Sequence, residues 1–145
     1  MHVRARLLLL AAVILAACTS KPGAVPPGQA PLTIEAGGGS GISRLTLSES
    51  AAKRLGIQTA TVAEQRIDGA TKTVIPYAAV IYDTDGQTWT YTNPSGFLFV
   101  RAVIKVERID GERAVLTLGP PLSTSVVTVG GAELWGAEHG VGGGH

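Results

Sequence analysis

FLFVRAVIKVERIDGERAVLTL, residues 97–118, is the stretch of sequence that decides the fold. Its first part, residues 97–109, is the longest run of strand-forming residues in the chain. Asp110-Gly111 favours a tight two-residue hairpin turn, and AVLTL, residues 114–118, supplies a returning strand. The stretch therefore predicts a long antiparallel hairpin, whose first strand we expect at the centre of a sheet.

The two faces of this strand differ in character, because successive side chains of a strand point to opposite sides of the sheet. One face is apolar throughout and is expected to pack inward. Its residues are Leu98, Val100, Ala102, Ile104 and Val106. The other face begins apolar and ends charged, with Arg101, Lys105 and Glu107. These three charged residues are candidates for contact with a partner protein; the alternative is an ordinary solvated strand face.

The residues around this hairpin add further short strands. VIPYAAVIYDTDGQTWTYT, residues 74–92, predicts two strands around the turn sequence DTDG, and Pro94 marks a second turn. The other β-like pieces are IQTATVAE (57–64), RIDGATKTVI (66–75) and VVTV (126–129). Turn signals recur about every eight to twelve residues, a spacing typical of all-β domains. The sequence therefore predicts an all-β fold, a small antiparallel meander or β-roll, over residues 42–138.

One short helix is predicted ahead of these strands. In SESAAKRLG, residues 48–56, Ser48 is a favourable N-cap and Gly56 is a favourable stop at the C-terminal end. Acidic and basic residues also lie at the ends that the helix dipole favours. Near the end of the chain, AELWGAEHG, residues 132–140, fits a short helix or a strand, and residues 139–145 are expected to be a disordered tail.

The N-terminus has the pattern expected of an export signal. Residues 1–17, MHVRARLLLLAAVILAA, place two arginines before an apolar run of eleven residues. A membrane-spanning helix needs about twenty apolar residues, so this pattern is typical of a secretory signal peptide. The segment ends in Leu-Ala-Ala followed by Cys18, which resembles the lipobox at which bacteria attach lipid to a cysteine.

We therefore expect the mature protein to begin at Cys18 and to be held on a bacterial membrane by acyl chains, facing the periplasm or the exterior. The alternative is a buried cysteine at the end of an ordinary helix. Proline and glycine dominate residues 18–41, and no apolar periodicity survives there. This segment is therefore expected to be a flexible tether between the anchor and the β-domain.

Composition and charge argue against several functions. The formal net charge is +1 and no basic patch occurs, so nucleic-acid binding has no electrostatic support. The single cysteine cannot form an internal disulfide, and alone it cannot build a zinc site. The acids are scattered and the histidines lie near the chain ends, so no catalytic set is visible. We expect a protein that is not an enzyme and that needs no cofactor.

Two patterns bear on metal binding. Residues 83–86, DTDG, resemble the start of a calcium loop, but the positions that need Gly and Glu are Thr88 and Pro94. A turn capped by the aspartate side chains is therefore favoured. The other possible ligands are Glu138, His139 and His145. They lie in a Gly-rich tail with nothing to fix their geometry, so neither pattern predicts a metal site.

Several segments resemble a known family. LTLSESAAKRLGIQTATV (45–62) and VIPYAAVIYDTDGQTWTYT (74–92) are similar to elements of the periplasmic adaptor subunits of resistance-nodulation-division efflux pumps, also called membrane fusion proteins. FVRAVIKV (99–106) and LTLGPPLSTSVVTVGGAELWGAEHG (116–140) resemble the closing part of the same subunits. The resemblance covers roughly residues 43–140. It implies the family's membrane-proximal domain, a small β-roll that lies near the inner membrane and contacts the pump.

The chain also departs from that family. Adaptors carry a lipoyl-like domain, a β-barrel and an α-helical hairpin between the two resembling parts. Here only residues 64–73 separate these parts, and no heptad pattern exists to build the hairpin. The resemblance therefore implies a shortened relative that retains mainly the membrane-proximal domain and cannot bridge two membranes.

Two interpretations of function follow. In the first, the chain is a lipoprotein that serves as an accessory or adaptor-like component of an efflux transport system and acts by docking on the transporter. In the second, it is a free-standing envelope lipoprotein that binds a ligand or another envelope protein, and the β-domain is only a scaffold.

Overall fold

The computed structural model describes residues 30–37 and 41–140. The predicted signal segment, residues 1–17, lies outside the described residues, as do Cys18 and His145. The described chain is mostly β with two helices, which confirms the predicted all-β class.

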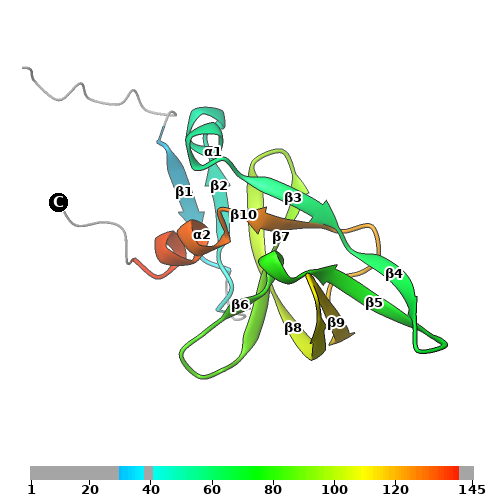
Figure 1. Ribbon diagram of the computed structural model, residues 1–145. Coiled ribbons are helices and arrows are strands. Elements are labelled where there is room, and N and C mark those ends of the chain that lie inside the picture. Colours follow the sequence, from blue (N-terminus) through cyan, green and yellow to red (C-terminus); the bar gives the residue numbers. More distant parts are fainter. Residues whose placement is uncertain (1–29, 38–40, 141–145) are drawn as a thin grey trace, which may run out of the picture.

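The strands of the described chain are β1 (Leu32–Glu35), β2 (Arg44–Leu47), β3 (Gln58–Thr61), β4 (Ala63–Ile67), β5 (Ala70–Pro76), β6 (Ile81–Tyr82), β7 (Thr88–Ser95), β8 (Leu98–Asp110), β9 (Arg113–Leu118) and β10 (Ser125–Val129). The helices are α1 (Glu49–Leu55), the 3₁₀ turn η2 (Tyr77–Ala79) and α2 (Gly131–Glu138). All the strand pairs are antiparallel, and the sheet curls into a half-barrel with α1 and α2 on one side (Figure 1).

One bent stretch of chain supplies both ends of the curled sheet. The strands follow the order β3-β10-β7-β8-β9-β5-β4, and only Val62 separates β3 from β4 in the sequence. The Val62 N–H donates to the carbonyl of Thr124 at 2.9 Å, and the Ser123 N–H donates to the carbonyl of Val62 at 3.0 Å. These two bonds hold the bend against the loop before β10, so β3 can pair with β10 while β4 pairs with β5.

The β-like piece RIDGATKTVI forms a hairpin, in which parts of β4 and β5 flank a tight turn. Ile67 of β4 lies opposite Ala70 of β5, so Asp68 and Gly69 form the two-residue turn. Both turn residues have positive φ, 51° and 80°, which is the conformation that an Asp-Gly pair favours between strands. In the β8–β9 hairpin Asp110 lies opposite Arg113, so that turn falls one residue later than predicted.

Helix α1 begins and ends where the sequence predicts. The Ala51 N–H donates to Ser48 Oγ at 3.2 Å, which satisfies one of the free amides of the first turn. Gly56 adopts the left-handed conformation with φ 62°, and its N–H donates to the Lys53 carbonyl at 3.1 Å. The helix buries Ala51 and Ala52 against the sheet.

The C-terminal stretch that fitted a helix or a strand forms the helix α2. Gly130 precedes it with φ 92°, and a Cβ at this position would lie 2.2 Å from Ile57 Cδ1. Only glycine therefore allows the chain to turn from β10 into α2 at this point. His139 was predicted to belong to a disordered tail, but it caps α2 with its backbone and stacks on Trp135. Residues 141–145 of that predicted tail lie outside the described residues.

Strand β1 corrects the predicted extent of the tether. Residues LTIE pair with β2 in a continuous register from Leu32 opposite Leu47 to Glu35 opposite Arg44. The segment is a strand because Thr33 and Ile34 favour β-structure and because β2, which pairs with β8 on one edge, offers its other edge. The tether predicted over residues 18–41 therefore reaches too far, because the folded part already includes β1.

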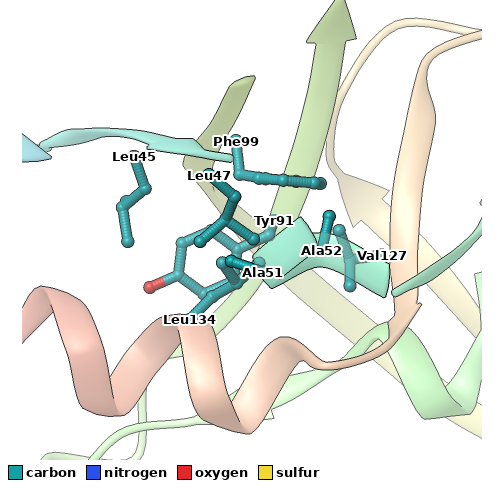
Figure 2. Packing of buried hydrophobic residues seen from close by; sticks show 8 residues of the cluster. All are labelled: Leu45, Leu47, Ala51, Ala52, Tyr91, Phe99, Val127 and Leu134. Atoms are coloured by element: carbon teal, nitrogen blue, oxygen red, sulfur yellow. The ribbon is translucent and has the colours of Figure 1, made fainter. Parts of the chain in front are cut away.

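The sheet has a separate apolar cluster on each face. The first lies between the sheet and the two helices (Figure 2) and consists of Leu45, Leu47, Ala51, Ala52, Tyr91, Phe99, Val127 and Leu134. The second consists of Val62, Ile75, Ala79, Ile104, Ala114, Leu116 and Val126. Strand β8 contributes Phe99 to the first cluster and Ile104 to the second. The prediction that only one face of this strand packs inward is therefore wrong, because helices cover the other face over part of its length.

Candidate functional site

Arg101 does not lie on the exposed face where the sequence placed it. Its side chain is 10% exposed, and its Nε lies 3.2 Å from Oε2 of Glu138, whose side chain is 3% exposed. The guanidinium also lies over two indole rings, with its central carbon 4.1 Å from the ring centre of Trp89 and 5.0 Å from that of Trp135. Arg101 is therefore part of the packing between α2 and the sheet.

Glu138 joins three segments that are far apart in the sequence. Its Oε2 accepts a hydrogen bond from the Tyr91 hydroxyl at 2.5 Å, and its Oε1 accepts one from the Ser43 N–H at 3.3 Å. Burial raises the pKa of Tyr91, and the hydrogen bond to Glu138 adds to this effect. The Arg101 Nε itself makes no hydrogen bond. Charge attraction, ring contacts and a long hydrogen bond of 3.5 Å from Nη2 to the Gly41 carbonyl hold this cation. We call the pair Arg101 and Glu138 the clamp, because it fixes α2 on the sheet.

The part of β8 beyond Ile104 has one open edge. Strand β7 pairs with β8 only as far as Thr88 opposite Ile104. From Lys105 to Asp110, β8 pairs with β9 alone, so its β7 side has no partner strand in the described part of the chain. A hollow of about 780 Å³ lies there. Its lining is Tyr82, Gly86, Gln87, Thr88, residues 103–109 and Thr117. We call this hollow the β8 notch.

Apolar side chains are exposed around the notch. Tyr82 is 53% exposed, Val103 38% and Ile109 40%. All three belong to the lining of the same hollow, and they come from two different strands. Exposed apolar side chains that gather in one hollow mark a surface that can be covered by a partner.

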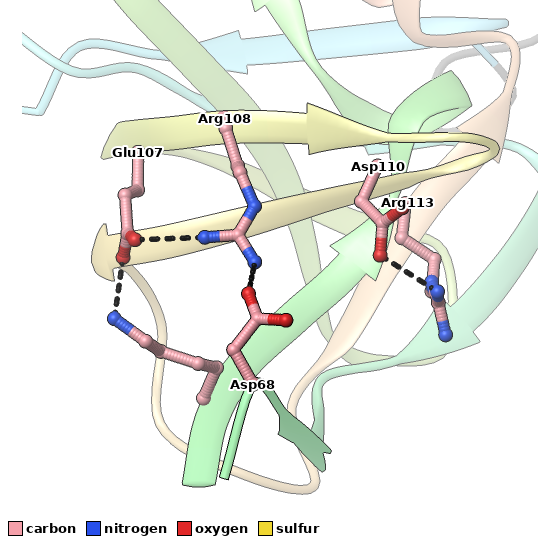
Figure 3. Close-up of polar contacts among 6 residues, drawn as sticks. Asp68, Glu107, Arg108, Asp110 and Arg113 are labelled. Atoms are coloured by element: carbon pink, nitrogen blue, oxygen red, sulfur yellow. Dashed lines mark hydrogen bonds and ion pairs between the residues drawn. The ribbon is translucent and has the colours of Figure 1, made fainter. Parts of the chain in front are cut away.

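The charges near the notch are paired, with one exception (Figure 3). Glu107 accepts hydrogen bonds from Lys72 Nζ at 2.7 Å and from an Arg108 nitrogen at 3.1 Å, and Arg108 also binds Asp68 at 2.7 Å. The hydrogen bond from Lys72 lowers the pKa of Glu107, with a smaller contribution from Arg108. Within the described residues, the Lys105 ammonium contacts no carboxylate. Of the three predicted contact residues, Lys105 and Glu107 therefore lie at the notch and Arg101 does not.

The turn at Asp83 has a structural role. Asp83 Oδ1 accepts the backbone N–H groups of Asp85 at 2.9 Å and Gln87 at 2.8 Å, and its Oδ2 accepts Trp89 Nε1–H at 2.8 Å. The bond from Trp89 is the main reason that the pKa of Asp83 is lowered. The predicted capping of local amides by the aspartate is confirmed, and the same carboxylate orients the indole ring that lies against Arg101.

The possible metal ligands near the C-terminus have other contacts. His139 stacks on Trp135 with 4.1 Å between ring centres, and its Nδ1 lies 2.9 Å from the Trp135 carbonyl oxygen. The Glu138 carboxylate already pairs with Arg101 and accepts a hydrogen bond from Tyr91. Among residues 30–37 and 41–140, no three His, Cys, Asp or Glu side chains come together in a group that could hold a metal ion.

Comparisons of the chain with protein-family models, with curated proteins and with solved structures gave no match. In the same described residues, none of the helices has the length and apolar character that a membrane crossing requires.

Proposed function

We propose that the chain is a lipid-anchored envelope protein that acts as an accessory, adaptor-like component of an efflux transport system by docking on another envelope protein. The proposal rests on the resemblance of residues 45–62 and 116–140 to a pump adaptor, on the anchor expected at Cys18, and on an exposed notch suited to a partner.

The observation that carries the proposal is the pairing of β3 with β10. β3 belongs to the first adaptor-like segment and β10 to the last, and Thr61 lies opposite Ser125. Between the adaptor-like parts the chain makes only the β4–β5 hairpin, at the place where adaptors carry their inserted domains. A membrane-proximal domain that lost these insertions needs such a short connection to keep its two halves in one sheet. The fold therefore supports the view that this chain is a self-contained docking domain.

The expected anchor limits where the partner can lie. Thirteen residues, 19–31, separate Cys18 from the start of β1. Even a fully extended chain of this length spans only about 50 Å. The β-domain would therefore work close to the membrane that holds the lipid, where a transporter presents its periplasmic or outer face. The short reach also raises the local concentration of the domain, so a weak contact suffices.

The test is chemical crosslinking in intact membranes, with the full-length protein tagged after His145. The wild-type chain is expected to remain in the membrane fraction and to crosslink to a transporter component. Cys18→Ala is expected to leave the membrane fraction and to lose that crosslink. If the wild-type protein is membrane-bound and crosslinks to no transporter component, the accessory role is wrong. The free-standing envelope lipoprotein then becomes the better interpretation.

A further inference from the structure

We propose that the β8 notch binds a segment of a partner protein that places a carboxylate against Lys105 and apolar side chains against Val103, Tyr82 and Ile109. This inference rests on the proposed docking function and names the chemistry of the docking contact. It follows from the charges and the apolar lining of the notch.

Lys105 is the unmatched charge of the notch. The only acid in the lining is Glu107, which is already bound by Lys72 and Arg108. Arg108 in turn binds Asp68, so this network is balanced without Lys105. A partner that covers the exposed apolar side chains would also remove water from the Lys105 ammonium. Such a burial is costly unless the partner supplies an opposite charge.

Other unpaired cations of the described chain do not have this setting. Arg44, Arg54 and Arg66 also contact no carboxylate within the ion-pair distance. Arg54 lines a groove between α1 and α2, but that groove also contains the acid Glu133. Arg44 and Arg66 line neither the β8 notch nor the groove between α1 and α2. Among these four cations of the described chain, Lys105 is the one that lies beside exposed apolar side chains in the notch.

Two other occupants fit the notch less well. The open edge of β8 invites addition of a strand, but its register shifts between Lys105 and Val106 and again between Val106 and Arg108. Irregular backbone and charged side chains are features that discourage pairing at strand edges. An anionic membrane surface attracts clusters of unpaired basic residues, and the notch has one. A protein segment that docks through its side chains is therefore favoured.

The test uses a zero-length carbodiimide, which joins an ammonium to a carboxylate only when the two groups touch. The tagged, lipidated protein is treated in native membranes, and crosslinked peptides are identified by mass spectrometry. Lys53 lies 2.6 Å from Glu49 and Lys72 lies 2.7 Å from Glu107, so both intrachain pairs report that the reagent works. Lys105 is expected to join an Asp or Glu of a different envelope protein, beside apolar residues of that protein.

Two variants separate the contact from general association. Lys105→Arg keeps the charge but loses the reactive amine, so the partner should still co-purify while this crosslink disappears. Lys105→Gln removes the charge and should lower the amount of co-purified partner about tenfold or more. If the partner co-purifies with Lys105→Gln as well as with wild type, the inference is wrong and the docking function stands. The same holds if Lys105 joins only this chain or a second copy of it. If no envelope protein co-purifies with wild type, the docking function itself fails.

Discussion

The two halves of strand β8 lie in very different surroundings. Over residues 98–104 the strand pairs with β7, and the helices α1 and α2 cover the side that carries Phe99 and Arg101. Beyond Ile104 it pairs with β9 alone and borders the notch. One strand therefore supplies both a buried residue of the first apolar cluster, Phe99, and the notch residues Lys105 and Glu107.

Arg101 and Lys105 show what this difference means for a charge. They are four residues apart on the same side of the strand by simple alternation, and both are cations. Arg101 is buried, paired with Glu138 and held between two indole rings, whereas Lys105 is exposed and unpaired among the described residues. A buried ion pair serves the fold, and an unmatched surface cation beside apolar side chains is available to a partner.

Truncation of one side chain in each half of β8 tests whether the two halves contribute differently to stability. Phe99→Ala should lower the free energy of unfolding by about 3–5 kcal/mol, because Phe99 is 2% exposed and fills the cluster under the helices. Ile109→Ala should cost less than about 1 kcal/mol, because its side chain is 40% exposed. Urea unfolding followed by tryptophan fluorescence measures both variants. Equal losses would mean that the two halves do not differ as described.

The next effect concerns the clamp. Glu138→Ala should cost about 3 kcal/mol, because it leaves the Arg101 guanidinium buried without an opposite charge. The double variant Arg101→Met with Glu138→Leu should recover most of this loss, since an apolar pair of similar size carries no unpaired charge. Recovery is judged from the same urea curves. A double variant less stable than Glu138→Ala would show that the ion pair itself provides the stability.

The ionisation of Tyr91 provides a pH-dependent test of the half of β8 that carries Arg101. Its raised pKa means that the folded protein keeps the Tyr91 hydroxyl proton at pH values at which an unfolded chain would have lost it. The resulting contribution to folding stability is complete below about pH 10, the ordinary pKa of tyrosine, and is lost as the pH rises further. In a spectroscopic titration, Tyr91 should therefore ionise only when the protein unfolds. Tyr91→Phe should remove that late step and cost about 1–3 kcal/mol, through the lost bond to Glu138.

A smaller effect is expected at Glu107 in the open half. Its pKa is lowered mainly by Lys72, so its contribution to stability is present above the ordinary pKa of about 4.3 and is lost as the pH falls through the lowered value. NMR titration of the side-chain carboxyl should show this lowered pKa. Lys72→Ala should move it back toward the ordinary value. An unchanged pKa in that variant would mean that Arg108 alone sets it.

The smallest effect on stability is expected at Lys105. Lys105→Ala should change the free energy of unfolding by less than about 0.5 kcal/mol, because its side chain is exposed and makes no ion pair in the described structure. Arg101→Ala serves as the matched change in the clamped half and should be strongly destabilising. If both changes are equally mild, the clamp adds little to the fold.

Local chemistry predicted much of this fold from the sequence. The caps of α1 and the hydrogen bonds from backbone N–H groups to the Asp83 carboxylate depend on residues at most four positions apart. All of them form. The β4–β5 turn carries the same Asp-Gly signal as the β8–β9 hairpin, yet it was hidden inside one run of strand-forming residues. Strand β1 was hidden in a similar way, because Pro and Gly dominate the average composition around it.

The candidate site depends on contacts that simple alternation does not reveal. Glu138 follows Arg101 by 37 residues, so burial of the cation depends on where α2 packs. The position at which β7 stops pairing with β8 is set by the β6–β7 turn and not by β8 itself. Beyond Lys105 the alternation holds despite the register shifts against β9, since Lys105, Glu107 and Ile109 are all exposed. The sequence predicts Arg101, Lys105 and Glu107 on one outer strand face, whereas in the structure Lys105 and Glu107 line the notch and Arg101 is buried against Glu138.

If the open half of β8 is the docking surface, a photoreactive group placed there should capture the partner. A photoreactive phenylalanine analogue replaces Val103 in the notch or, as the control, Ile34 on β1, which is 45% exposed and lies outside the notch. The transporter component captured by the wild-type chain is expected to crosslink through position 103 and not through position 34. A crosslink to that component at position 34, with none at position 103, would contradict this expectation.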